Sequence, residues 1–170
     1  MKIITISGSS RSDSANTRLL TALPKLFPQH TFQQYAQINQ LPLFQADADK
    51  HPWQEAVLAW RTATANSDAL IISTPAYIHN IPALLKNALE WVTSSGELAQ
   101  KRVLAITFTP HAPRGEKAMQ SLLWSLQALK ANVVVSLPLY QNEIEYDASG
   151  NFTKNEAVDM LIEGLNLLVN

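Results

Sequence analysis

The chain has 170 residues, of which 46% are hydrophobic and 16% charged, and its net charge is −1 at pH 7. A chain of this length can bury a sizeable core, and this composition excludes a disordered protein. The balanced charge excludes sequence-independent binding to nucleic acid, and no apolar run is long enough to cross a bilayer. We therefore expect one domain over residues 1–170, with neither nucleic-acid nor membrane partners.

The cysteine and histidine content narrows the chemistry further. There is no Cys, which excludes disulfides, thiol catalysis, iron–sulfur clusters and thiolate zinc sites. The four His are scattered without ligand-like spacing, so we expect no metal. The first residues lack the apolar segment of a secretory signal, and we expect a cytoplasmic protein.

Strand-like and helix-like patterns alternate along the chain. Short apolar or β-branched runs indicate strands, and the run from Ala69 to Ile72 is continuous, as in a strand buried on both faces. Apolar residues at helical spacing separate these runs. In chain order, the pattern predicts a strand at 2–6, a helix at 15–27, a strand at 31–35, a helix at 52–66 opened by Pro52, a strand at 68–73, a helix at 82–93 opened by Pro82, a strand at 103–108, a helix at 116–131, a strand at 133–135 and a helix from Thr153 or Asn155 to about Val169.

This order of elements favours one fold class. Strands that alternate with helices imply parallel pairing and right-handed crossovers. The pattern is typical of a flavodoxin-like, doubly wound five-stranded parallel sheet in a three-layer α/β/α arrangement. Ligands of such sheets bind at the carboxyl ends of the strands, so the loops after the first, third and fourth strands form the candidate site.

The first of these loops has the features of a phosphate site. It reads Gly8-Ser9-Ser10-Arg11-Ser12-Asp13-Ser14-Ala15-Asn16 and lies between a strand and a helix. Free N–H groups at a helix start, serine hydroxyls, an Asn amide and a guanidinium all suit phosphate oxygens. A serine-rich turn with a capping Ser or Asp would give the same pattern. The spacing is neither a dinucleotide fingerprint nor a nucleoside triphosphate loop.

The second loop has the features of a platform for a flat ring. It reads Thr74-Pro75-Ala76-Tyr77-Ile78-His79-Asn80-Ile81-Pro82. Two prolines stiffen it at the end of a buried strand, and Tyr77 offers an aromatic face beside backbone amides. A turn whose Tyr77 covers the edge of the core explains the same residues, and we expect His79 at the surface rather than as a catalytic base.

Together, the two loops resemble those of a known family. The pattern Gly8-Ser9-x-Arg11-x-x-Ser14-x-Asn16-x-x-Leu19, followed by Thr74-Pro75-x-Tyr77-x-x-x-Ile81-Pro82-x-x-Leu85-Lys86-Asn87-Ala88-Leu89-Glu90-Trp91, is similar to the NAD(P)H-dependent FMN reductases. That family includes chromate, quinone and azo-dye reductases on a flavodoxin-like fold. Nearly the whole chain fits, including residues 142–152 before the last helix.

The resemblance implies an activity and a cofactor site. It implies an enzyme that passes a hydride from NADPH or NADH through FMN to a small-molecule electron acceptor (a quinone, an azo compound, a metal ion or free flavin), with no catalytic residue of its own. It also implies a homodimer or homotetramer. Arg114 or Lys117 could meet the phosphate of NADPH, or form only a solvated helix start. The implied cofactor-binding residues are Ser9, Arg11, Ser14, Ala15 and Asn16 at the phosphate, Pro75, Ala76, Tyr77 and Ile78 along the ring, and Thr109 at its other edge.

Two departures from the family pattern leave other functions open. Ala76 and Ile78 stand where the family usually has Glu and Asn, and the third loop, residues 107–115, is poor in glycine where the family is rich in it. A degenerate member that binds another phosphorylated ligand, or none, would also fit. A non-enzymatic flavin electron carrier is a further hypothesis, which the net charge of −1 disfavours because such carriers are usually strongly acidic.

Overall fold

Five strands form one sheet in the computed structural model, which describes residues 1–170. The strand order is β2-β1-β3-β4-β5, and all neighbours pair in parallel. This order confirms the predicted flavodoxin-like, doubly wound sheet. In chain order, the elements are β1 (Lys2–Ser7), α1 (Ala15–Ala22), η1 (Leu23–Lys25), β2 (Thr31–Gln34), η2 (Gln37–Gln40), α2 (Glu55–Ala65), β3 (Ala69–Thr74), α3 (Ala83–Glu90), β4 (Arg102–Thr109), α4 (Glu116–Ala128), β5 (Asn132–Tyr140), η3 (Gln141–Glu143) and α5 (Glu156–Val169).

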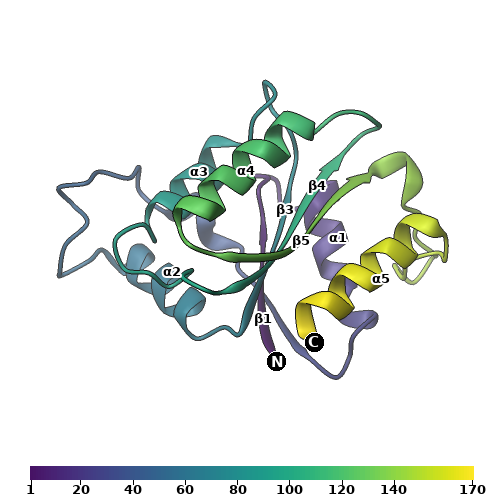
Figure 1. The fold of residues 1–170 in the computed structure, drawn as a ribbon, viewed down its shortest axis with the longest axis horizontal. Coiled ribbons are helices and arrows are strands. Elements are labelled where there is room, and N and C mark those ends of the chain that lie inside the picture. Colours follow the sequence, from purple (N-terminus) through teal and green to yellow (C-terminus); the bar gives the residue numbers. More distant parts are fainter.

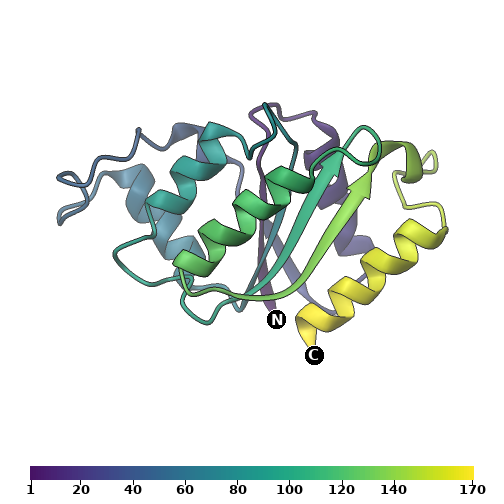
Figure 2. The same cartoon turned by 45° about the horizontal axis from the view of Figure 1, so that its top comes forward.

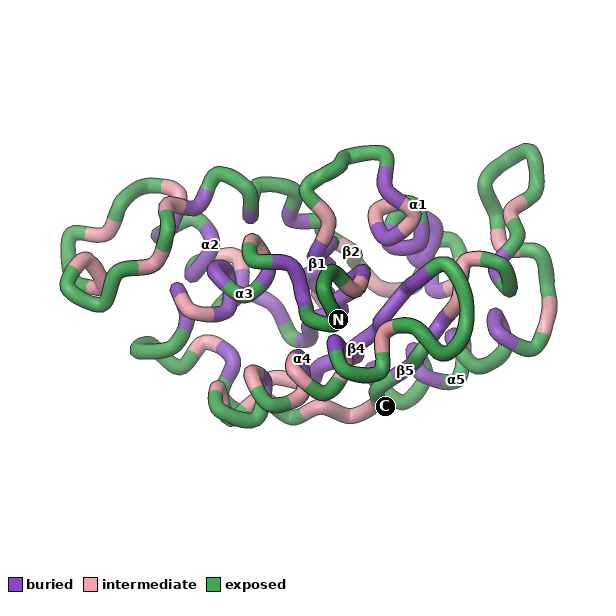
Figure 3. The backbone as a smooth tube through the Cα atoms, turned by 90° about the horizontal axis from the view of Figure 1, so that it is seen from above, coloured by how far each residue is buried: buried purple, intermediate pink, exposed green.

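Helices cover both faces of the sheet (Figures 1 and 2). α1 and α5 lie on one face, and α2, α3 and α4 lie on the other. The central strands are therefore buried on both sides, which is why β3 is a continuous apolar run. Two hydrophobic cores result, one around Trp60 and Trp91 and the other around Phe108. Seen from above, most of the connecting loops are exposed (Figure 3), while the central strands β1, β3 and β4 are buried.

Two elements that differ from the predicted ranges have a proline at the difference. α1 ends at Ala22 rather than at residue 27, because Pro24 has no N–H to continue the helix, and a short 3-10 turn follows. β5 extends as far as Tyr140, well beyond the predicted range 133–135. It includes Pro138, which a strand tolerates when it lies at the edge of the sheet, as β5 does.

The start of α2 also differs, for a tertiary reason. α2 begins at Glu55 rather than at Pro52. Trp53 is held outside the helix, because its indole N–H donates to Asp49 Oδ1 at 3.2 Å and the Arg61 guanidinium lies 3.9 Å from the centre of its ring. Asp49 and Arg61 lie within eight residues of Trp53, but their contacts depend on how the loop before α2 packs against the helix, which helical spacing does not indicate.

The remaining helices begin and end close to the predicted residues. Asn155 rather than Thr153 caps α5, since its side-chain oxygen accepts a hydrogen bond from the Val158 N–H at 3.0 Å. No helix in the structure is both long and apolar enough to cross a membrane.

The strand order places a crevice at one edge of the sheet. β1 and β3 are neighbours, but the chain leaves β1 toward β2 on one side and continues from β3 toward β4 on the other. Loops that leave the carboxyl ends of such strands diverge and open a ligand site between them. The loops after β1, β3 and β4 (the first, second and third loops) all lie at this edge.

Candidate functional site

The first loop is fixed at both ends. The Gly8 N–H donates to the Ser73 carbonyl at 2.8 Å, and a Cβ on Gly8 would lie 2.6 Å from Thr74 Oγ1, so only glycine fits here. At the other end, Ser14 caps α1, and its Oγ accepts a hydrogen bond from the Thr17 N–H at 3.1 Å. The loop is therefore held in one shape against the end of β3.

Between these ends, backbone N–H groups are free. The amides of Ser10, Ser12 and Asp13 make no hydrogen bond within the chain. The first turn of α1 adds the amides of Ala15 and Asn16, which have no partner inside the helix. Clustered N–H groups at a helix start attract anions, because the helix dipole adds partial positive charge. The first loop therefore fits a phosphate group.

Two arginines flank these amides. Arg11 pairs with Asp13 at 3.2 Å, but the two side chains are 71% and 81% exposed. Such a pair contributes only about 0–1 kcal/mol, so the guanidinium can exchange the carboxylate for a phosphate. Arg18 lines the same cavity as Arg11. Arg18 is not among the residues predicted from the sequence, although its position one helical turn after Ser14 is a usable signal.

Asn16 has a structural role that the sequence did not reveal. Its side chain is buried, with Oδ1 accepting from Ser73 Oγ at 2.7 Å and Nδ2 donating to the Phe108 carbonyl at 3.2 Å. These bonds tie α1 to β3 and β4. The side-chain amide is thus occupied within the fold, and only the backbone N–H of Asn16 remains for a ligand.

The second loop ends in a tight turn. The N–H of Tyr77 donates to the Asn80 carbonyl and the N–H of Asn80 donates to the Tyr77 carbonyl, both at 2.9 Å. Ile78 and His79 have φ angles of 49° and 59°, which makes a type I′ turn. The amides of Ala76, Ile78 and His79 make no hydrogen bond within the chain. This loop therefore offers backbone donors and the half-exposed Tyr77 ring to a flat ligand.

The third loop is supported from beneath by two threonines. Thr109 Oγ1 donates to the Arg114 carbonyl at 2.9 Å, and Thr109 is 1% exposed. Gly115 closes the loop at a φ of 102°, where a Cβ would press on Thr107 and Thr109 at 3.1–3.2 Å. Thr109 therefore shapes this loop, and Pro110 and Arg114 line the cavity in its place.

The three loops enclose one cavity of about 270 Å³. It brings together eight of the ten residues expected from the sequence, all except Ile78 and Thr109. An adjoining cavity of about 380 Å³ shares Ala76 and Arg114 with the first and includes Ile78, His79 and Lys117. The first cavity is lined by Ser9, Arg11, Ser14, Ala15, Asn16, Arg18, Pro75, Ala76, Tyr77, Pro110, Arg114 and Gln141.

A larger cavity lies elsewhere and fits an anionic cofactor poorly. It measures about 580 Å³ and runs along the end of β5 and the start of α5. Its charged residues are Glu143 and Glu156, with no Lys or Arg. Two carboxylates repel a phosphate, so the smaller cavity between the three loops is the better cofactor site.

Comparison with known proteins agrees with this geometry. Residues 1–143, which include all three loops, match the family model described as NADPH-dependent FMN reductase. The chain belongs to this family. It is an NAD(P)H-dependent oxidoreductase of the FMN and quinone reductase type.

The proteins that are similar in sequence to this FMN reductase family member include quinone reductases. The 2-hydroxy-1,4-benzoquinone reductase of a Burkholderia species is 31% identical over 161 residues, covering 92% of this chain and 87% of the relative. A quinone reductase of Escherichia coli K12 is 29% identical over 138 residues, covering 79% and 73%. The solved structure of the flavoenzyme FerB, an NAD(P)H:(acceptor) oxidoreductase from Paracoccus denitrificans, matches with a TM-score of 0.81 at 24% identity, over 99% of this chain and 94% of that one. At that identity the structure shows the shared fold alone.

The second loop of this reductase allows a test of how it meets a flavin. Ile78→Asn should change FMN affinity by less than about tenfold, because a neutral hydrogen bond contributes only about 0.5–1.5 kcal/mol and Ile78 lies outside the loop cavity. Tyr77→Ala should weaken binding more, because it removes an aromatic face that lines the cavity. Titration of each variant with FMN, followed by flavin fluorescence, measures both effects.

Two controls separate local strain from cofactor contact. Tyr77→Phe keeps the ring and should bind FMN nearly as tightly as the wild type. Ile78→Asn should raise the melting temperature, because Asn tolerates a positive φ better than a β-branched residue does. Wild-type FMN affinity in Tyr77→Ala would show that the second loop is not the flavin platform.

Proposed function

We propose that this protein binds FMN in the cavity between its three loops and passes a hydride from NAD(P)H to a small acceptor. The observation that carries the proposal is the first loop, where free backbone amides and two arginines surround one cavity beside the second loop. The membership of the FMN reductase family supports the same cofactor.

The residues of the chain divide the binding of FMN among the three loops. The first loop would hold the phosphate through backbone N–H groups, Ser9 and Arg11. The free amide of Ala76 and the ring of Tyr77 would meet the flat part of the cofactor, and Pro110 would lie at its other edge. FMN, once bound, supplies the capacity to accept and release a hydride, so no protein acid or base is required.

The altered residues of the second loop do not remove these contacts. Ala76 and Ile78 replace side chains that the family usually has, but the amides of both residues are free in the structure. Backbone donors do not depend on the side chain that a residue carries. This favours FMN binding over the alternative of a degenerate member.

The adjoining cavity suits the nicotinamide dinucleotide. It shares Ala76 and Arg114 with the proposed FMN cavity, and it adds Lys117 and the first turn of α4, whose N-cap Gly115 provides no side-chain cap. A dinucleotide that reaches from this cavity to the flavin ring would place phosphates near these cations and free amides.

Lys117→Met should raise the KM for NADPH about tenfold and leave FMN affinity unchanged. Lys117 lines the adjoining cavity but not the proposed FMN cavity. A hydrogen bond to a charged group contributes about 1.5–3 kcal/mol, so its loss should affect NADPH and not FMN. Steady-state oxidation of NADPH at saturating FMN measures the change. Lys154→Met, which removes an exposed lysine far along the chain, is the matched control. An unchanged KM in Lys117→Met would leave Lys117 as a solvated helix-start residue.

Quinones are the proposed acceptor class. Two of the relatives are named for quinones. The more similar of the two is a 2-hydroxy-1,4-benzoquinone reductase. The half-exposed Tyr77 beside the proposed ring position leaves an open apolar surface against which a flat acceptor can pack. Azo compounds, oxidised metal ions and free flavin are the other acceptors to compare.

Two measurements test the proposed function. The absorbance spectrum of the purified protein, recorded before and after FMN and then NADPH are added, should show bound flavin and its bleaching by NADPH. NADPH oxidation should then accelerate when a benzoquinone is added. Flavin binding without quinone-dependent turnover would support the electron-carrier hypothesis, and no flavin binding would support a degenerate member.

We also propose a homodimer or homotetramer, with each chain folding as one domain in the cytoplasm. The fully exposed, apolar Ile78 beside the half-exposed Tyr77 supports association, because exposed apolar side chains at a site often mark a contact surface. Sedimentation velocity at micromolar concentration should show a species larger than the 18.8 kDa chain. A purely monomeric protein would contradict this proposal.

A further inference from the structure

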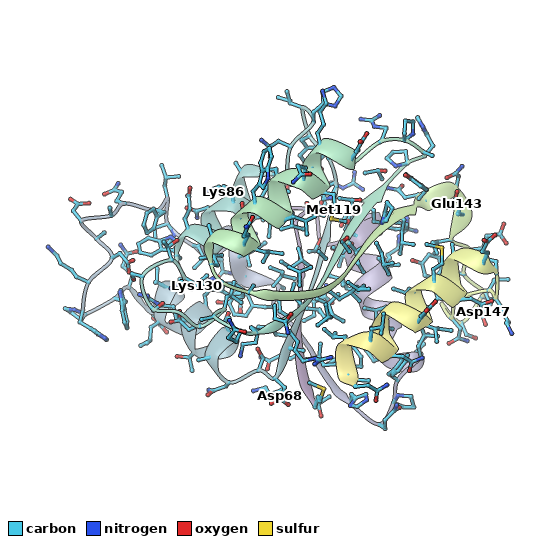
Figure 4. All side chains as sticks on the ribbon, viewed as in Figure 1. Asp68, Lys86, Met119, Lys130, Glu143 and Asp147 are labelled. Carbon is cyan, nitrogen blue, oxygen red and sulfur yellow. The ribbon has the colours of Figure 1, made fainter.

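A further ligand-sized cavity, apart from the three described above, lies between α4 and the edge strand β5. Its volume is about 380 Å³. α4 contributes residues at helical spacing, among them Met119 and Leu123, and β5 contributes Pro138 from the face turned toward α4. In Figure 4, the Met119 side chain extends from α4 toward the sheet. This cavity shares no residue with the proposed FMN cavity.

Thr107 gives this cavity an unpaired polar group. Thr107 is 1% exposed, and its Oγ1 makes no hydrogen bond within the chain. It lies opposite Pro138, whose side chain has no polar atom, and Gly115 comes so close that a Cβ there would be 3.2 Å from Thr107 Oγ1. A buried hydroxyl without a partner costs about 1–3 kcal/mol, and a ligand oxygen in the cavity would remove that cost.

The walls of the cavity restrict the chemistry of the ligand. Met119, Leu123 and Pro138 form an apolar surface, and a methionine sulfur packs favourably against aromatic rings. Glu116 is the only charged residue of the lining, so an anion would be repelled. The volume lies within the range of about 300–1,000 Å³ that is usual for small-molecule sites.

We propose that this cavity binds a small uncharged aromatic compound, with a carbonyl or phenolic oxygen that hydrogen-bonds to Thr107 Oγ1. Apolar side chains beside a few neutral polar groups, here Thr107, Gln120, Ser136 and Tyr140, suit a flat compound that carries a polar oxygen. The cavity shares no residue with the proposed FMN cavity, although it shares Pro113 and Glu116 with the cavity proposed for the dinucleotide, so the proposal does not depend on FMN binding.

Binding of 4-hydroxyacetophenone tests the proposal, with 4-hydroxybenzoate as an anionic counterpart. Ligand-observed NMR with the wild-type protein should detect the ketone and show weaker binding of the carboxylate. The measurement is repeated with saturating FMN, which should not displace the ketone. Failure of the wild type to bind the ketone, equal binding of the carboxylate or displacement by FMN would each overturn the proposal.

Two variants of Thr107 test the role of the hydroxyl. Thr107→Val keeps the shape of the side chain and should bind the ketone about tenfold more weakly, with a melting temperature no lower than that of the wild type. Thr107→Ser keeps the hydroxyl and should retain binding. Equal affinity in Thr107→Val would contradict the assignment, and the wild-type comparisons remain decisive if a variant fails to fold.

Discussion

Arg11→Ala is expected to weaken FMN binding about tenfold or more and riboflavin binding far less. A charge-assisted hydrogen bond to a phosphate contributes about 1.5–3 kcal/mol, and tenfold in affinity corresponds to about 1.4 kcal/mol. Riboflavin has no phosphate, so it does not lose this contact. Fluorescence titrations of the wild type and the variant with both flavins give the ratio directly.

Three further variants make the test of the first loop specific. Arg18→Ala should weaken FMN binding in the same direction, because Arg18 lines the same cavity. Asp13→Asn should leave FMN affinity unchanged or slightly higher, because it removes the carboxylate that now pairs with Arg11. Lys154→Ala, an exposed lysine outside the site, serves as the control. Equal losses for FMN and riboflavin in Arg11→Ala would place that side chain away from the phosphate.

Arg61→Met should lower the melting temperature by about 6–20 °C. Removal of one partner from a buried ion pair costs about 3–5 kcal/mol of folding stability. Each kcal/mol shifts the melting temperature of a domain of this size by about 2–4 °C. Arg61 is 2% exposed, and its guanidinium lies 2.9 Å from Asp49 and 3.0 Å from Glu97. It also donates to Ser94 Oγ and Ser95 Oγ. The variant leaves two carboxylates without their cation, and thermal unfolding followed by circular dichroism measures the loss.

An exposed ion pair and a compensated variant provide the controls. Lys86→Met breaks the pair between Lys86 and Glu90, whose side chains are 48% and 36% exposed, and should change the melting temperature only slightly. Adding Asp49→Asn and Glu97→Gln to Arg61→Met removes the unpaired charges and should recover part of the lost stability. A melting temperature that is unchanged in Arg61→Met would refute the structural role of this cluster.

The pH dependence of Arg61→Met follows from Asp49. Burial raises the pKa of the Asp49 carboxyl, but hydrogen bonds from Ser94, Arg61 and Trp53 and the charge of Arg61 outweigh burial, so the pKa is lowered below its usual value. A lowered pKa means that the carboxylate stabilises the fold above its unfolded pKa, and that this contribution is lost as the pH falls through the folded pKa. Without Arg61, the hydrogen bonds from Ser94 and Trp53 remain but the charge and the hydrogen bond of Arg61 are lost, so the difference in stability between wild type and variant should shrink as the pH falls from neutral through the folded pKa of Asp49.

The sequence predicted most of the residues that line the candidate cavity, because two loops carry local signals. The free amides of the first loop follow from its position between a strand and a helix, and the two prolines of the second loop indicated a stiff turn. The resemblance to the FMN reductases, which the family match confirmed, rests on the same two loops. Eight of the ten expected residues line one cavity, because parallel strands bring their carboxyl ends to the same edge of the sheet.

The order of strands and helices, and hence the doubly wound sheet, could be predicted from apolar periodicity, because that periodicity reports burial directly. Which polar groups are already hydrogen-bonded within the fold depends instead on tertiary contacts. Asn16 carries the spacing of a phosphate ligand, yet its side chain bridges β3 and β4, and Thr109 supports the third loop from below. Pro52 carries the signature of a helix start, yet Trp53 is held outside α2 by Arg61. The partners of Asn16 lie 57 and 92 residues away, and those of Thr109 and Trp53 are brought into contact by the shape of a loop, so local spacing indicates none of these contacts.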